Sequence, residues 1–240
     1  MKSSVPSQPS DERPRNHLLR ALPAADFHRL RPDLETIPAP VKHVFHRPGQ
    51  RVDYVYFPNG GVASITAGLS DGAIIEAATV GLEGMVGIEA FLGKDPVASG
   101  ETMMQVGGAD VERLTVGAFR RELARQGALF DLMGRYAQTT LAQMLQSTAC
   151  NARHHVQERC PRWLLMTHDR VARDDFDLSH EFLAAMLGVR RQSVTVVAGT
   201  LQAAGLITYK HAHVRILDRK GLEAASCECY AMIRSRFDSL

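Results

Sequence analysis

Arg190, Arg191, Gln192, Ser193 and Thr195 place a dense group of hydrogen-bonding side chains at the start of a predicted helix. Arginine pairs bidentately with guanine and glutamine with adenine, so Arg191 and Gln192 have the chemistry of base-reading residues. Their position fits that chemistry, because the N-terminal turns of a recognition helix are the part that enters the major groove. The sequence therefore predicts a DNA-reading surface here.

Two short helices on either side of a tight turn must position these residues. Ser179 is a good N-cap for the first helix, and Gly188 can adopt the left-handed conformation that ends it. Gly205 ends the second helix. The residues predicted to point inward are Phe182, Leu183, Met186, Leu187, Val194, Val197 and Leu201. This pattern predicts a helix-turn-helix; the alternative is a pair of surface helices in an all-helical lobe, with two arginines on a solvated face.

The residues that follow favour the helix-turn-helix. Positions 207–217 alternate apolar and polar side chains on both sides of a short turn, which predicts a two-stranded wing. Lys210, His211 and His213 lie at its tip and suit contact with phosphate groups. A winged helix-turn-helix is thus predicted near the C-terminus.

Length and charge limit the remaining possibilities. The chain has 240 residues, enough for two domains, and its 28 Lys and Arg against 26 Asp and Glu give a net charge of only +2. Any DNA binding must therefore depend on where the charges lie. With no secretory signal and no long apolar run, we expect a cytoplasmic protein with no membrane partner.

In the first half of the chain, the composition and the predicted secondary structure change twice. Residues 1–15 are rich in Ser, Pro and charge and predict a disordered leader; short helices are expected at 16–22 and 23–30, ended by Pro32, Pro38 and Pro40. From 41 to 111, turn signals recur about every ten residues, which is typical of a compact antiparallel roll or barrel. Residues 54–57 and 73–77 are its clearest predicted strands.

A long helix is predicted from Leu114 to about Arg153, apolar over a wide face that must be buried. It could pack on the roll, but its length and its place between two domains favour a symmetric dimer helix. The residues expected at the dimer seam are Met133, Tyr136, Ala137, Thr140, Met144 and Thr148. Residues 152–155 are the expected hinge, since Pro161 opposes an unbroken helix, and a further helix is expected at 162–170.

A glycine-punctuated roll, a long helix, a hinge and a winged helix-turn-helix in this order resemble the Crp/Fnr family of bacterial transcription regulators. The resemblance covers about residues 20–235 and is most specific in 180–206 and in Gly81-Leu-Glu-Gly-Met-Val-Gly87. It implies a homodimer that reads a two-fold symmetric double-stranded DNA site, with RNA polymerase as a further partner. Carried over by residue, it implies base reading by Arg191 and Gln192 and phosphate contacts by Ser179 and Ser193. Val196 stands where the cyclic-AMP receptor has a third polar base contact, so a different target sequence is expected.

The effector region departs from that family. Gly84 is followed by Met85, so the ribose-binding carboxylate of cyclic-nucleotide binders is absent at that position, and no arginine occurs from 52 to 112. A buried cyclic phosphate would lack its charge partner, which is costly, so we do not expect cyclic AMP binding. An uncharged effector, or none, is expected at a pocket formed by Glu83, Gly84, Met85, Val86, Gly87, Val97, Ala98, Ser99, Met144 and Leu145.

Cysteines and histidines offer a second, weaker hypothesis. A thiol- or metal-responsive regulator could use Cys150, Cys160, Cys227 and Cys229, but these split between the helical region and the C-terminus. Cys227 and Cys229 in one helix would point in different directions, so buried structural thiols are favoured. His211 and His213 share a face of the wing, and His154 and His155 lie at the hinge with no second ligand visible in the sequence. We predict no metal site and no cofactor.

An enzyme is the remaining alternative class. A cupin-like small-barrel metalloenzyme would show two histidines one residue apart followed by a carboxylate, and the roll has none. A third alternative is a regulatory module whose winged domain contacts only other proteins, but Arg191 and Gln192 at base-reading positions argue against it. The prediction is an α+β chain without catalytic residues. It divides into a leader (1–15), a cyclic-nucleotide-binding-like β-roll of the double-stranded β-helix or jelly-roll kind (16–118), a dimerisation helix with hinge (119–155) and a winged helix-turn-helix (156–240).

Overall fold

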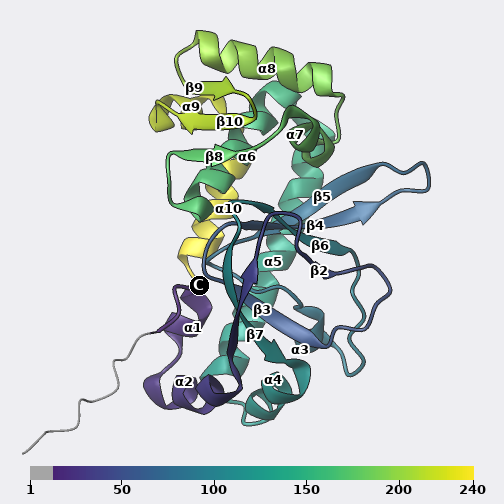
Figure 1. Ribbon diagram of the computed structural model, residues 1–240, viewed down its shortest axis with the longest axis vertical. Helices are drawn as coiled ribbons and strands as arrows, with labels where there is room; N and C mark the ends of the chain where they lie inside the picture. The colour runs from purple at the N-terminus through teal and green to yellow at the C-terminus, as the bar shows by residue number, and fades with distance from the viewer. Residues whose placement is uncertain (1–12) are drawn as a thin grey trace, which may run out of the picture.

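A computed structural model describes residues 13–240 as a roll, a long helix and a C-terminal helix-turn-helix, as the sequence predicts (Figure 1). The predicted leader lies outside the described residues except for 13–15. Within 13–15, Arg13 donates hydrogen bonds to the carbonyls of Arg20 and Leu22. The two predicted short helices are confirmed as α1 (His17–Ala21) and α2 (Ala24–Leu30).

The roll consists of two antiparallel sheets, in the orders β1-β7-β3 and β2-β6-β4-β5. Pro38 does not end the N-terminal region as expected. It lies in β1, which among residues 13–240 pairs only with β7, and an edge strand tolerates the missing N–H of proline. Both clear sequence-predicted strands are found, as β3 and β5. The elements are η1 (Arg31–Asp33), β1 (Glu35–Ala39), β2 (Val44–His46), β3 (Tyr54–Pro58), β4 (Val62–Gly68), β5 (Ile74–Val80), α3 (Glu89–Leu92), β6 (Glu101–Val106) and β7 (Ala109–Thr115).

The predicted long helix is two helices, α4 (Val116–Leu123) and α5 (Ala128–Arg153). Leu114 belongs to β7, and Thr115 caps α4 by accepting a hydrogen bond from the Ala118 N–H. Gln126, with φ of 51°, and Gly127 separate α4 from α5. The helix α5 runs the length of the roll and reaches the C-terminal domain (Figure 1).

The hinge lies where it was predicted, but Pro161 is not its cause. The break falls at His154 and His155, both in extended conformation, and α6 (Val156–Val171) continues through Pro161. Gln157, whose carbonyl loses its helical partner at Pro161, is exposed to water, which limits the cost. The helix expected at 162–170 therefore begins six residues earlier.

The C-terminal domain surrounds a core that includes Trp163, Phe176, Leu183 and Val197. Its wing has three strands, in the order β8-β10-β9, rather than the two predicted. The last helix, α10, returns to pack on α5. The elements are β8 (Asp175–Asp177), α7 (His180–Leu187), α8 (Arg191–Ala203), β9 (Ile207–Lys210), β10 (His213–Ile216), α9 (Arg219–Ala225) and α10 (Cys229–Asp238). Within residues 13–240, no helix is both long and apolar enough to span a membrane.

Candidate nucleic-acid interface

The helix-turn-helix is built as its local sequence predicts. The Ser179 hydroxyl accepts a hydrogen bond of 3.2 Å from the Phe182 N–H at the start of α7, and Gly188 ends that helix with φ of 62°. Leu183, Met186 and Leu187 are buried, whereas Phe182 is half-buried. These contacts fix α8 across the end of the molecule away from the roll (Figure 1).

The N-terminal half of α8 presents an exposed polar face. Arg190, Arg191, Gln192 and Thr195 are exposed, and Val196 beside them has 66% of its surface accessible. On the opposite side, Val194, Val197 and Leu201 enter the core. Four of the five predicted residues of this segment are therefore accessible to a ligand, while Ser193 is half-buried.

Arg191 is held by Glu181 on α7, with 2.8 Å between Nη1 and Oε1. Both side chains are largely exposed, so the pair contributes at most about 1 kcal/mol. A bidentate contact of arginine with guanine is worth about 1–3 kcal/mol, so a base can displace Glu181.

The three predicted phosphate-binding residues of the wing lie in different surroundings. Lys210 and His211 are exposed at the turn, where His211 and Ala212 have φ of 50° and 62°, the conformation of a tight hairpin turn. His213 lies instead between carboxylates, 2.9 Å from Asp177 and 3.6 Å from Asp175. Because that acidic setting repels phosphate, His213 is not expected to contact the DNA backbone.

Side chains from α5 and α6 cover the loop predicted to form an effector pocket. A Cβ on Gly84 would lie 2.6 Å from the Tyr136 hydroxyl, and one on Gly81 would lie 2.5 Å from the Arg170 side chain. The Tyr136 hydroxyl donates to the Met85 carbonyl at 2.8 Å, and Arg170 forms an ion pair of 2.7 Å with Glu83. The glycines thus permit close approach of the protein's own side chains.

The predicted pocket residues do not converge on one cavity. Met85, Val86 and Ala98 are buried, whereas Val97 and Ser99 are exposed, as is Leu145 on the outer face of α5. Glu83 lines a different cavity of about 250 Å³ between the roll, α6 and α10. Its other lining residues are His17, Leu82, Met166, Asp169, Arg170, Tyr230, Ile233, Arg234, Phe237 and Asp238.

Half of the predicted dimer seam faces inward. Met133, Tyr136 and Thr140 are buried within the chain itself, so they cannot contact a second copy. The exposed side of α5 carries Leu141 and Leu145, which are 59% and 63% accessible, with Ala137 and Met144 half-buried and Thr148 exposed near them. The helix α5 is thus apolar on two faces, and its exposed apolar residues lie on the face that the roll does not cover.

A half-buried carboxylate joins the roll to the C-terminal domain. Glu76 on β5 accepts hydrogen bonds from the Trp163 indole of α6, at 2.8 Å, and from the Ser64 hydroxyl, at 2.5 Å. Burial raises the pKa of Glu76 to about 7, although both hydrogen bonds oppose the shift. Ser64 also contacts Gln105, whose amide contacts Met186 of α7. Because one hydroxyl proton cannot serve two acceptors, a proton on Glu76 satisfies this network best.

Three of the four cysteines meet a histidine in the structure, although the sequence predicts these cysteines to be separated. Cys150 and His154 at the end of α5 meet Cys227 and Cys229 at the start of α10. Hydrogen bonding from Cys227 lowers the pKa of Cys150 to about 5, and the charge of Arg162 acts in the same direction. Cys160 is elsewhere in the core, where burial raises its pKa to about 12. The predicted separation of the cysteines was wrong, because α10 folds back on α5.

Comparisons with known proteins agree with this geometry. The profile of the Crp-like helix-turn-helix domain matches residues 158–225. A search of curated proteins found no match.

Three solved structures illustrate the similarity of the whole chain. The c-di-GMP responsive global regulator CLP of Xanthomonas campestris is 16% identical, with a TM-score of 0.66 over 81% of this chain and 99% of that one. A Crp/Fnr-family regulator from Eubacterium rectale is 16% identical, with a TM-score of 0.67 over 88% and 98%. FixK2 from Bradyrhizobium japonicum is 15% identical, with a TM-score of 0.66 over 81% and 98%. Residues 158–225 are therefore a Crp-like helix-turn-helix domain, carried by a chain with the fold of the Crp/Fnr-family transcription regulators.

Proposed function

We propose that this protein is a homodimeric transcription regulator that reads a two-fold symmetric DNA site with one α8 helix per half-site. The exposed face of α8 carries the proposal: Arg191, Gln192, Thr195 and Val196 share it at the end that such a helix inserts into the major groove. Arg191 would read guanine and Gln192 adenine, while the apolar Val196 suits contact with a thymine methyl group. Lys210 and His211 would contact phosphates from the wing.

A second copy is the proposed occupant of the outer face of α5. Gly134, Gln138, Leu141, Leu145, Thr148 and Ala152 follow one another along this face, and none is charged. A charge-free stripe with two exposed leucines suits an isologous contact in which both copies present the same residues. Such a dimer would set the two α8 helices about one DNA turn, roughly 34 Å, apart.

The roll is proposed to bind no cyclic nucleotide. Tyr136 and Arg170 occupy the approach to Gly84 and Gly81, and Glu83 is already paired with Arg170. Contact with RNA polymerase stays a prediction.

Two single replacements test the DNA-reading assignment. Arg191→Ala is expected to weaken binding to the preferred site by about 1–3 kcal/mol and to relax the preference at one base pair per half-site. Lys210→Ala is the matched control, because a lost phosphate contact should weaken all DNA sequences alike and reduce the salt dependence. Binding of each variant to the preferred site and to single-base variants of it is measured by fluorescence anisotropy. Equal, sequence-independent losses for both variants would contradict the assignment of Arg191 as a reader.

A further inference from the structure

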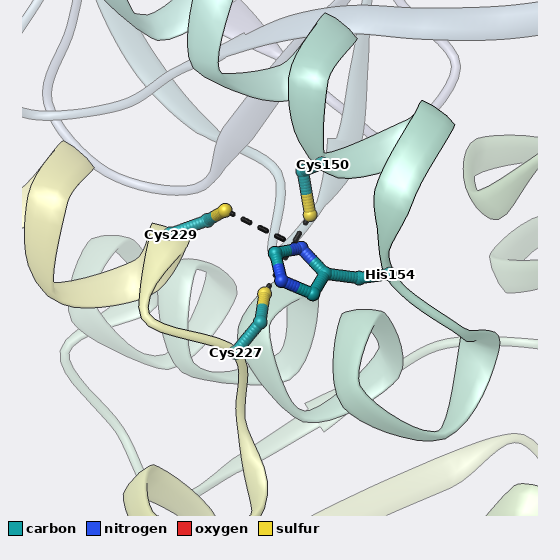
Figure 2. Close-up of side chains that lie close together, drawn as sticks. All are labelled: Cys150, His154, Cys227 and Cys229. Atoms are coloured by element: carbon teal, nitrogen blue, oxygen red, sulfur yellow. Dashed lines mark hydrogen bonds between the residues drawn. The ribbon is translucent and has the colours of Figure 1, made fainter.

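The hinge between α5 and α6 carries a cluster of metal-ligating side chains that the DNA-reading function does not use. Cys150 and His154 lie one helical turn apart at the end of α5, so they share a face. Cys227 precedes α10 and Cys229 begins it, so the two thiols are not fixed on one helix and both can face α5. Figure 2 shows the three sulfur atoms around the His154 ring.

The distances suit a tetrahedral metal ion. The ligand atoms of all four residues lie within 4.8 Å of one another. The Sγ atoms of Cys150 and Cys227 are 3.5 Å apart, and the Cys229 Sγ is 3.6 Å from the His154 Nδ1. A zinc–sulfur bond of about 2.3 Å places the sulfur atoms of a tetrahedral site about 3.8 Å apart, so little movement would close the site.

The surroundings of the cluster orient its ligands. The Nε2 atom of His154 lies 3.3 Å from the Glu228 carboxylate, which fixes the tautomer that directs the Nδ1 lone pair toward the thiols. The Gln146 amide donates a hydrogen bond of 3.0 Å to the Cys229 sulfur. A carboxylate behind a ligating histidine and a donor to a ligating sulfur are typical of the outer shell of metal sites.

Two buried arginines supply charge complementarity. Arg159 and Arg162 are 8% and 5% accessible, and neither forms an ion pair with a carboxylate among residues 13–240. Their Nε atoms are buried without a hydrogen-bond partner in that part of the chain, and their charges act on the Cys150 sulfur. Zn²⁺ with three thiolates carries a net charge of −1, which would compensate one of these two buried positive charges.

We propose that Cys150, His154, Cys227 and Cys229 bind one Zn²⁺ ion per chain and so fasten the end of α5 and the hinge to the start of α10. Three buried thiolates and one half-buried imidazole in a closed set select zinc over Mg²⁺ or Ca²⁺ and leave no open coordination position, as in structural sites. Binding displaces the protons of those thiols that are still protonated. The zinc site is not part of the DNA-reading surface, and the proposal of zinc binding does not depend on the proposed DNA-binding function.

Metal content of the full-length protein tests the site. Protein produced with zinc and kept reduced is expected to contain about one zinc per chain by mass spectrometry. Replacement of the zinc by Co²⁺ should give the strong visible and near-ultraviolet bands of tetrahedral thiolate coordination. Cys227→Ser should lose the metal and these bands, whereas the matched control Cys160→Ser removes a buried thiol outside the cluster and should retain both.

Thermal unfolding of the wild type, with and without a chelator, tests the site even if a variant fails to fold. Chelation should lower the Tm of the wild type and of Cys160→Ser by about 10 °C, since a ligand that binds only the folded state stabilises it. It should not change the Tm of Cys227→Ser. Folded wild type without zinc and without cobalt bands, or one that contains a Cys150–Cys227 disulfide instead, would overturn the proposal. Undiminished zinc in Cys227→Ser would overturn it too.

Discussion

Replacing both Leu141 and Leu145 by glutamate is expected to convert the proposed dimer into monomers and to weaken binding to a two-fold symmetric DNA site by at least about 100-fold. Both leucines project from the uncharged outer face of α5. Glutamates there would bring four like charges together in the proposed dimer. They would also remove the four leucine side chains whose burial would stabilise it. A monomer reads one half-site at a time and loses the gain from joining two binding events, which is about 10²–10⁴-fold.

Sedimentation velocity and anisotropy on one DNA site measure both effects. Leu92→Glu is the matched control, because Leu92 is 68% accessible in α3 and lies near Phe130 at the start of α5, about three helical turns from Leu141. It makes the same chemical change and should leave the protein dimeric. A double variant that still sediments as a dimer, or a Leu92→Glu variant that becomes monomeric, would mean that α5 is not the dimer contact.

Replacing Glu76 by glutamine is expected to stabilise the protein by about 2–3 kcal/mol at pH 8 and to change little near pH 4.5. The pKa of Glu76 is raised to about 7 from 4.5, so the folded state binds the proton more tightly than the unfolded state. In the wild type, the stability from this group is complete below about pH 4.5 and is lost as the pH rises to about 7. Glutamine keeps the acceptor for Trp163 and does not titrate.

The only tryptophan of the chain, Trp163, donates its indole N–H to Glu76 and reports on this contact directly. The tryptophan fluorescence of the wild type should change with a midpoint near pH 7, and that of Glu76→Gln should not. Urea unfolding at pH 5 and pH 8 measures the free energies. Glu35→Gln, at an exposed position, is the control and should keep the wild-type titration. An identical titration in Glu76→Gln would exclude Glu76 as its source.

The helix-turn-helix and the strands of the roll could be predicted because their signals are local. Ser179 and Gly188 mark the ends of α7 by side-chain capping and backbone conformation. The break at 124–127 could not be predicted, since the leucine-rich pattern runs through it and Gln126 adopts a positive φ that its type does not favour.

Contacts between distant segments account for the remaining differences. Periodicity places Met133 and Leu141 on faces of a helix, but which face the roll covers depends on tertiary packing. Cys150 and Cys227 are 77 positions apart, and only the return of α10 to α5 brings them together. His213 was expected to contact phosphate because the sequence does not show that β8 places Asp175 and Asp177 beside it.

The central claim is tested most directly by selecting DNA fragments from a random pool with the purified full-length protein, at two salt concentrations. We predict enrichment of a two-fold symmetric motif with half-sites about one helical turn apart and with a guanine that loses its preference when Arg191→Ala is used. Enrichment of a single, unsymmetric element would contradict the dimeric reading mode. Weak binding that depends steeply on salt and enriches no sequence would contradict sequence-specific reading by α8.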